Sequence, residues 1–297
     1  MDLVTGRVAE RQAYLLIQQR MDREVRAPVG QAWLTNDPPT LYSSRLCDAS
    51  EFQMPEIRER LHALNYDAHD IHRKHWEKAA IALLVERFGY FDEQSSGLGL
   101  GVAAENLLYL FSNHCRRVVG IDLYSPTFRD GTRLSCEDVY RAAPFDYRRD
   151  RLEIAAMDMR FLDFPDSSFD FVWSVSSVEH VGSVDEIIAT WRQIERVLKP
   201  GGHAFISSEW NRLSRNPVYQ PGAILFDETL YVYLVSKLHR LKPLGPLHLC
   251  QSHHEDHVFV DEWATASGLE IRPCINLFWA GTFITPVLFV LARSSHD

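Results

Sequence analysis

Residues 95–124 read SSGLGLGVAAENLLYLFSNHCRRVVGIDLY, and this stretch decides the fold. Glycines alternate with leucines at Gly97, Gly99 and Gly101, where a strand-to-helix turn would bend sharply and approach a ligand closely. Residues 118–121 predict a second short strand that ends at Asp122, about twenty residues after the glycines. A carboxylate at that strand end can accept hydrogen bonds from both hydroxyls of a ribose. We therefore expect a protein that binds an adenosine-containing cofactor.

Three further segments follow in the order of a parallel α/β sheet. Residues 152–157 predict a third strand that ends at Asp158 and Met159, whose carboxylate and thioether suit the amine and the ring face of an adenine. Residues 169–181 form an almost continuously apolar run, which is typical of a strand covered on both faces. The sequence RVLKPGG at 196–202 closes a helix before a fifth strand at 203–208.

Taken in this order, the segments resemble the class I S-adenosylmethionine-dependent methyltransferase family, from Gly97 to Trp210. The resemblance implies that S-adenosyl-L-methionine is the cofactor. It places the glycine turn along the methionine moiety, Asp122 at the ribose, and Asp158 with Met159 at the adenine. Further candidate cofactor contacts are Leu123, Ser174 and Arg73. The chain departs from the family at Gly97, because an acidic residue usually stands two positions before the first glycine of the core pair.

A nicotinamide-dependent dehydrogenase is the competing interpretation of the glycines, since Gly99-x-Gly101-x-x-Ala104 also fits the dinucleotide fingerprint. A single glycine turn does not separate the two families. The succession of Asp122, Asp158 and the Lys199-Pro200-Gly201-Gly202 turn favours the methyltransferase.

Composition narrows the class of partner. The chain has 297 residues and a formal net charge of −9, so it lacks the excess of Lys and Arg that a general nucleic-acid binder uses against phosphates. Its 5 cysteines are scattered without C-x-x-C spacing, which fits reduced thiols. The N-terminal residues mix charges into every turn and contain no apolar signal region. We expect a cytoplasmic protein without a membrane span and without a nucleic-acid partner.

The pattern predicts an α/β fold: a doubly wound, seven-stranded, mostly parallel sheet of the Rossmann-like methyltransferase type. Residues 1–91 are expected to form an N-terminal helical extension and cap, and residues 92–297 the methyltransferase domain. An insertion at about 211–259 follows the fifth strand, and we expect it to form a lid over the acceptor site. Within it Tyr231, Tyr233 and His239 are candidates either for acceptor contact or for core packing.

Residues 71–81, IHRKHWEKAAI, predict a helix whose Trp76 packs on the sheet. One interpretation leaves His72, Arg73 and Glu77 on a solvated face. The other makes the helix a cap from which Arg73 or Lys74 offers a cation to the methionine carboxylate. The same stretch resembles one found in bacterial methyltransferases associated with glycan assembly.

His180 is the strongest candidate for a catalytic base, because it follows the fourth strand at the rim of the expected pocket and imidazole titrates near neutral pH. Glu179 is the second candidate and Glu209 the third; His180 could instead brace its loop. Ser176-x-x-Glu179-His180 resembles a metal-binding E-x-x-E-H set that lacks its first glutamate. Because residues 253–257, HHEDH, are typical of a solvated loop, we predict no metal site.

These expectations combine into one functional hypothesis. The chain transfers a methyl group from S-adenosylmethionine to a hydroxyl of a small molecule or glycan. An amine or carbon acceptor is the first alternative. A protein that binds the cofactor without transfer is the second. Neither the acceptor's identity nor the oligomeric state follows from the sequence.

Overall fold

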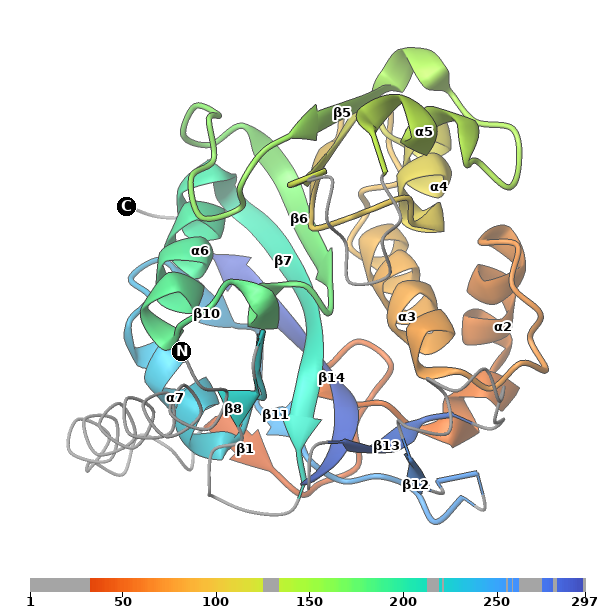
Figure 1. Ribbon diagram of the computed structural model, residues 1–297, viewed down its shortest axis with the longest axis vertical. Coiled ribbons are helices and arrows are strands. Elements are labelled where there is room, and N and C mark those ends of the chain that lie inside the picture. Colours follow the sequence, from red (N-terminus) through yellow and green to blue (C-terminus); the bar gives the residue numbers. More distant parts are fainter. Residues whose placement is uncertain are drawn as a thin grey trace, which may run out of the picture.

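The computed structural model describes residues 33–124, 134–212, 219–220, 222–254, 256–257, 259–261, 274–279 and 282–295. Its centre is a twisted sheet between two helical layers (Figure 1). Five parallel strands form the core of this sheet: β3 (Ser96–Leu100), β4 (Arg117–Asp122), β5 (Leu152–Ala156), β6 (Phe169–Val175) and β7 (Leu198–Asn211). The long strand β14 (Thr282–Arg293) pairs antiparallel with β7.

The core strands follow the order β14-β7-β6-β3-β4-β5. Chain connections therefore leave β3 in opposite directions, toward β4 on one side and β6 on the other. In an open parallel sheet, the crevice for a ligand lies at the carboxyl ends of the strands where this reversal occurs. The predicted doubly wound, mostly parallel sheet is confirmed, and its architecture places a site at the ends of β3 and β6.

The position beyond β14 is divided among three short strands. Each residue of β14 from Ile284 to Ala292 already faces β7 on one edge. Strands β13 (Asn276–Trp279), β2 (Arg45–Leu46) and β10 (Leu241–Pro243) therefore pair with the other edge in succession. Outside them lie β11 (Leu247–His248), β1 (Leu34–Thr35) and β12 (Phe259–Asp261), and β8 (Tyr219–Gln220) with β9 (Ala223–Ile224) forms a separate hairpin.

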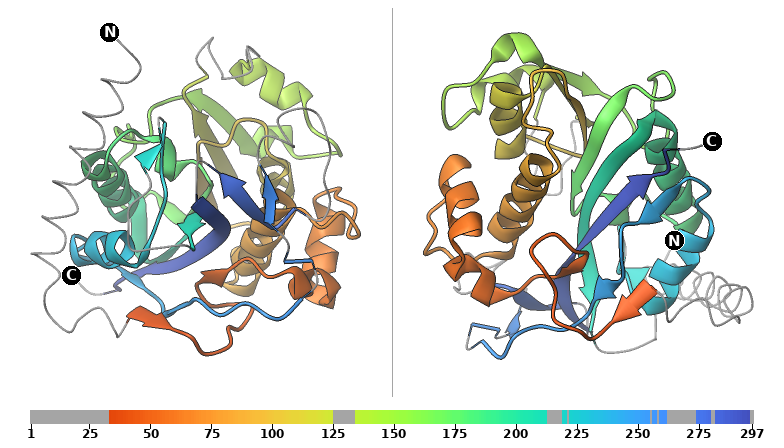
Figure 2. Two further views of the ribbon diagram at one scale, coloured as in Figure 1. Left: turned by 60° about the horizontal axis from the view of Figure 1, so that its bottom comes forward. Right: turned by 180° about the vertical axis from the view of Figure 1, so that it is seen from behind.

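The two helical layers follow from the alternation of side chains along the strands. Phe171 and Trp173 of β6 pack with α2 (Pro55–Ala63), α3 (Arg73–Arg87) and α4 (Asn106–His114) in one hydrophobic cluster. Val172 points the other way and packs with α6 (Val184–Val197) and α7 (Glu228–Ser236). Figure 2 shows the two layers from behind. The remaining helical elements are α5 (Cys136–Arg141), η2 (Ala49–Gln53), η3 (Arg149–Arg151) and η4 (Val178–His180).

The N-terminal segment is more closely joined to the sheet than a separate cap would be. Strands β1 and β2 belong to the sheet, and α3 packs directly on β6 and β7. The expectation of a solvated face on α3 is wrong, because Glu77 is fully buried and Trp76 lies in the core. Burial of a carboxylate requires polar partners, which the site supplies.

The insertion after β7 is also different from a simple lid. Helix α7 packs on the sheet, with Tyr231 stacked on Phe289 at a centroid distance of 5.0 Å. Tyr231 and Tyr233 are both buried, so they serve the core rather than an acceptor. Among the described residues of the insertion, Gly222, before this helix, is the one that lines the cavity described below. None of the described helices combines the length and the apolar character needed to cross a bilayer.

Strand β3 passes beneath two large aromatic rings, and this explains its glycines. A Cβ atom on Gly97 would lie 2.3 Å from the Phe171 ring, and one on Gly99 would lie 2.4 Å from the Trp173 ring. Both glycines belong to the strand rather than to the turn. The expectation that they line the cofactor is therefore corrected: they make room for aromatic packing.

This close contact predicts that Gly99→Ala destabilises the fold by about 1–3 kcal/mol, because the added methyl group overpacks the core against Trp173. The free energy of unfolding, measured by urea denaturation, should fall accordingly. Gly245→Ala is the matched control, since nothing lies within 4 Å of its Cβ position. Equal stability of the two variants would contradict this account of strand β3.

Candidate functional site

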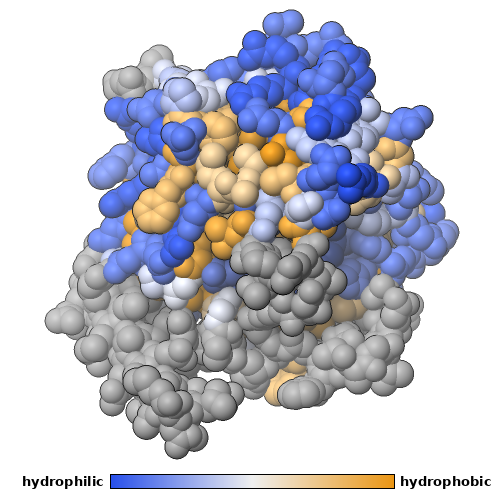
Figure 3. Space-filling model, turned by 45° about the horizontal axis from the view of Figure 1, so that its top comes forward, coloured by the Kyte–Doolittle hydropathy of each residue, from blue (hydrophilic) through white to orange (hydrophobic). Residues whose placement is uncertain are grey.

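A cavity of about 770 Å³ opens at the carboxyl ends of β3, β4, β5 and β6. Its wall is partly apolar, with Val102, Met157, Met159, Val175 and Val181 among the lining residues. Figure 3 shows apolar residues gathered at the centre of one face and hydrophilic residues around them. Leu123, at the cavity wall, is 60% exposed, and Phe161, just beyond the cavity residue Arg160, is 71% exposed. A cavity of this kind suits a ligand with both apolar and polar groups.

The turn after β3 forms the floor of the cavity. Gly101 and Ala103 have φ angles of +65° and +42°, in the left-handed region. The N–H groups of Gly101 and Val102 donate to the Ile121 carbonyl at 2.8 and 3.2 Å, which anchors the turn to the end of β4. A Cβ atom on Gly101 would lie 2.5 Å from Ser177. Glycine is thus required here for both conformation and space, and Gly101 alone of the three predicted glycines lines the cavity.

Asp122 lies at the cavity where β4 ends. Its Oδ2 atom accepts a hydrogen bond from the Ala103 N–H at 2.8 Å, and its Oδ1 atom accepts one from the Leu123 N–H at 2.7 Å. Each oxygen retains a second lone pair for a ligand hydroxyl. The carboxylate therefore fixes the turn and the strand end together, with Leu123 beside it on the cavity wall.

Asp158 and Met159 follow β5 and also line the cavity. The Asp158 carboxylate accepts a fork of hydrogen bonds from Arg160, with Nη2 at 2.6 Å and Nε at 3.0 Å. These hydrogen bonds hold the pKa of Asp158 below its ordinary value, although partial burial opposes the effect. Arg160 also pairs with Glu186 in the first turn of α6. Asp158 is therefore an oriented carboxylate that is ionised at neutral pH.

Ser174 is not at the cavity, which corrects its assignment. It is buried within the sheet, and its hydroxyl donates to the Leu100 carbonyl at 3.0 Å. Ser177, three residues later, lines the cavity and donates to the Gly101 carbonyl at 2.9 Å. Strand β6 ends at Val175, and the cavity is lined by this last residue and by residues that follow the strand, while Ser174 faces the sheet interior.

Arg73 also lies elsewhere than predicted. Its guanidinium group pairs with Glu209 and lies 3.9 Å from Glu77, and it is not among the residues lining the cavity. The cations that do line the cavity from α3 are Lys74 and Lys78. Lys78 donates to the Tyr66 hydroxyl at 3.1 Å. The cap interpretation of this helix therefore rests on Lys74, the second of the two cations considered, together with Lys78.

A buried carboxylate positions Lys74. Glu77 accepts hydrogen bonds from the hydroxyls of Ser176 and Ser207, each at 2.6 Å, and lies 3.0 Å from the Lys74 ammonium. Burial opposes its ionisation, but Lys74, Arg73 and the two hydroxyls together hold the pKa of Glu77 below its ordinary value. The Glu77 carboxylate thus joins helix α3 to Ser176, just after the end of β6, and to Ser207 within β7.

The two catalytic candidates differ in position. His180 lines the cavity, and its Nδ1 atom lies 2.5 Å from the Gly222 carbonyl oxygen. A carbonyl only accepts, so Nδ1 carries the proton and the lone pair of the neutral ring is on Nε2. Glu179 is fully buried and not among the cavity residues. Burial, with the carboxylates of Glu209 and Glu77, raises its pKa to about 8, which Lys74 only partly offsets. Of the two candidates, His180 is the one that lies at the cavity.

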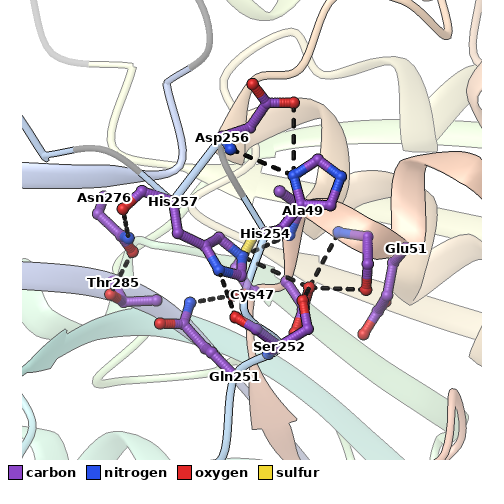
Figure 4. A network of polar contacts seen from close by, with 12 residues as sticks. Cys47, Ala49, Glu51, Gln251, Ser252, His254, Asp256, His257, Asn276 and Thr285 are labelled. Carbon is purple, nitrogen blue, oxygen red and sulfur yellow. Dashed lines mark hydrogen bonds and ion pairs between the residues drawn. The ribbon is translucent and has the colours of Figure 1, made fainter.

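The histidine-rich loop has a structural role (Figure 4). His257 accepts a hydrogen bond from the Ala49 N–H at its Nε2 atom, 2.8 Å away, and its Nδ1 atom lies 2.9 Å from the Ser252 carbonyl. Asp48 accepts from Ser252 and Ser50, and these bonds with His257 hold its pKa well below the ordinary value despite burial. This loop fastens η2 to the sheet, so at His257 it is not the solvated connection expected. Within the described ranges no group of three metal-ligating side chains converges.

Comparison with known proteins agrees with this geometry. Residues 96–206 match the family model described as a methyltransferase domain. This segment is a methyltransferase domain of the class I S-adenosylmethionine-dependent family. It extends from β3 to β7 and so includes Gly101, Asp122 and Asp158. Helix α3, with its lysines, lies before the matched segment.

Two curated relatives are methyltransferases. The chain is 27% identical over 136 residues to the 27-O-demethylrifamycin SV methyltransferase of Amycolatopsis mediterranei, covering 45% of this chain and 48% of the relative. It is 38% identical over 53 residues to the sterol 4-C-methyltransferase strm-1 of Caenorhabditis elegans, covering 18% of this chain and 15% of the relative. The chain thus spans about half or less of the relatives it matches.

One solved structure supports the fold of the methyltransferase domain. It is a protein assigned as a sarcosine dimethylglycine methyltransferase from Galdieria sulphuraria, with a TM-score of 0.50 and 16% identity. The alignment covers 81% of this chain and 98% of that one. At this level of identity the similarity concerns the fold alone.

Several cavity residues of the methyltransferase domain were not anticipated from the sequence. They are Ala103, Ala104, Glu105, Arg160, Ser177 and Val181, with Lys78 and Gly222 outside the matched segment. The signal that could have identified the turn residues was the true end of β3 at Leu100, because the residues that follow a strand end face the ligand. Lys78 lies one turn after Lys74 on α3, so helical spacing already placed the two lysines on one face.

Glu77→Gln should lower the free energy of unfolding at pH 7 by about 3–5 kcal/mol, because it leaves buried cations without their carboxylate. The folded-state pKa of Glu77 is depressed, so its contribution is present above the unfolded pKa of about 4.3 and is lost as pH falls below it. Urea denaturation at pH 7 and near pH 3 should therefore show a larger difference from wild type at pH 7.

Glu86→Gln, on the same helix, is the control. Its carboxylate is 41% exposed and pairs with Arg60 at 2.9 Å, and Arg60 keeps a second partner in Glu59 at 2.7 Å, so the expected change is below about 1 kcal/mol. Similar effects of the two substitutions at pH 7 would refute the special role of Glu77.

Proposed function

We propose that the chain is an S-adenosylmethionine-dependent methyltransferase that methylates a hydroxyl of a small molecule or glycan. The observation that carries this proposal is the convergence of three strand ends on one cavity. Gly101 follows β3, Asp122 ends β4, and Asp158 with Met159 follows β5. These groups suit, in order, a close backbone approach, a ribose diol and an adenine.

The cofactor's chemical groups fit the residues present. Asp122 has lone pairs for two hydroxyls and is rigidly held by two backbone N–H groups. Asp158 is oriented by Arg160, and the Met159 thioether lies on the cavity wall beside it. Lys74 presents an ammonium group at the same cavity and is held there by Glu77. That cation suits a ligand carboxylate.

S-adenosylmethionine, when bound, supplies a methyl group on a positively charged sulfur that is open to direct displacement. The contribution of the protein is to align the acceptor with this group and to exclude water. The apolar wall formed by Val102, Val175 and Val181 serves the second purpose. His180 serves as base: its Nδ1 proton is held by the Gly222 carbonyl, so Nε2 can take the proton of an acceptor hydroxyl.

Two observations favour oxygen as the accepting atom. A hydroxyl needs a base, and His180 lies at the cavity with its tautomer set by Gly222. In addition, the relative from Amycolatopsis mediterranei is named for a 27-O-demethylrifamycin substrate. An amine that binds in its neutral form would need no such base. A protein that binds the cofactor without transferring its methyl group would not need a base at this position either.

Asp122→Asn should weaken binding of S-adenosylhomocysteine by about 10- to 100-fold, because it removes the charge that strengthens hydrogen bonds to the ribose while preserving side-chain shape. Isothermal titration calorimetry measures the change. Asp150→Asn serves as control, since Asp150 is an exposed residue paired with Arg148. Unchanged affinity in Asp122→Asn would remove the central support for this proposal.

His180→Gln should reduce turnover of a hydroxyl acceptor by about 10²- to 10⁴-fold, while the affinity for S-adenosylhomocysteine changes little. The measurement is acceptor-dependent formation of S-adenosylhomocysteine with a panel of sugars, phenols and amines. His239→Gln, at an exposed position after α7, is the control. Full activity of the His180 variant, or turnover only with amines, would exclude base-assisted transfer to oxygen. Cofactor binding without any turnover would favour the non-catalytic alternative.

A further inference from the structure

We propose that Glu105 receives the α-ammonium group of the cofactor, while Lys74 and Lys78 face its carboxylate. This inference rests on the proposed function. It concerns the residues of the same cavity that would bind the amino-acid end of the cofactor. The amino-acid end of S-adenosylmethionine is a zwitterion. A site that binds it needs one anionic and one cationic partner close together. The cavity is lined by groups of both kinds: Glu105 comes from the turn after β3, and Lys74 and Lys78 come from α3.

The Glu105 side chain is held in position by a neighbouring indole. The Trp173 Nε1–H group donates to its Oε1 atom at 2.6 Å. Glu105 is the N-cap residue of α4, yet its side chain makes no capping hydrogen bond and is directed to Trp173 instead. It forms no ion pair with Lys78, whose ammonium donates to Tyr66. Across the described residues, no donor hydrogen-bonds to Glu105 Oε2.

The other carboxylates of the cavity are already engaged. Asp158 accepts several hydrogen bonds from Arg160. Both oxygens of Asp122 accept backbone N–H groups. Glu105 is therefore the cavity carboxylate with an oxygen that lacks a donor in the described part of the chain. An ammonium group, which has three donors and no acceptor, is the ligand group that such an oxygen suits.

Strand β3 cannot supply an alternative acid at this place. A Cβ atom on Gly97, where the family usually has its acid, would lie 2.3 Å from the Phe171 ring, and one on Gly99 would lie 2.4 Å from the Trp173 ring. Aromatic rings therefore occupy the space that a side chain at either position would need. The Trp173 indole also holds Glu105 through its N–H group. Gly99, Trp173 and Glu105 thus form one arrangement in which the carboxylate comes from the turn rather than from the strand.

The electrostatic surroundings favour a cation beside Glu105. Burial, with the negative charges of Glu77 on α3 and Asp122 on β4, raises the pKa of Glu105 to about 7, while Lys78 on α3 and the Trp173 hydrogen bond on β6 act in the opposite direction. A ligand ammonium would stabilise the ionised form. Cofactor affinity should consequently rise as Glu105 loses its proton, from about pH 6 to about pH 7.5.

The test compares two ligands by isothermal titration calorimetry on the full chain. S-adenosylhomocysteine carries the amino-acid group, and 5′-methylthioadenosine has the same nucleoside and a sulfur without it. Glu105→Gln preserves an oxygen acceptor for Trp173 and removes the charge. We expect it to weaken S-adenosylhomocysteine binding by about 10- to 100-fold and to leave methylthioadenosine binding unchanged. The rise of affinity with pH should disappear in the variant.

Glu153→Gln is the matched control, because Glu153 is an exposed residue on β5 paired with Arg117. Equal weakening of both ligands by Glu105→Gln would mean that the residue only supports the turn, and would overturn the assignment. Unchanged binding of S-adenosylhomocysteine would overturn it as well. If wild type bound neither ligand, the proposed function itself would fail and the assignment with it, an outcome distinct from the other two.

Discussion

The Glu77 carboxylate is the constraint on which the cation side of the site depends. It has no exposed surface, and it joins helix α3 to Ser176 after β6 and to Ser207 on β7. A charge in such a place is stable only when partners compensate for lost hydration. Lys74 provides that compensation and, by doing so, is held at the cavity. One buried interaction thus fixes both the packing of the helix and the position of a binding group.

The other side of the cavity is formed by the turn after β3, which is held by backbone geometry rather than by a buried charge. The turn after β3 is anchored through backbone hydrogen bonds to Ile121 and through Asp122, so its shape follows the end of β4. Strand β3 itself lies so close to Phe171 and Trp173 that side chains at Gly97 and Gly99 would overlap the rings. The glycines that suggested ligand binding therefore serve two purposes. Of Gly97, Gly99 and Gly101, Gly101 is the one that combines a left-handed conformation with a place on the cavity wall.

The sequence predicted the fold well because each parallel strand has a strong local pattern. Apolar runs at β4, β5 and β6 end in polar residues, and Asp122, Asp158 and His180 all lie at the cavity as a result. The errors arose where packing across the sheet decides the outcome. Neither the burial of Glu77 nor the pairing of Arg73 with Glu209 follows from local spacing, since both depend on residues more than a hundred positions away. Helix α7 had the apolar content of a core helix, and its burial overrode the expectation of a lid.

The contact between Gly222 of the insertion and His180 separates the stability of the fold from the proposed acceptor site. Helix α7 is part of the core, so the insertion cannot change freely without cost to stability. Gly222, however, contributes a carbonyl to the His180 ring and lines the cavity, while the groups assigned to the cofactor lie on β4, β5, α3 and the turn after β3. Changes around Gly222 would therefore alter the orientation of His180, the proposed base, and the part of the cavity proposed for the acceptor. Asp122, Asp158 and Lys74 would keep their own partners throughout.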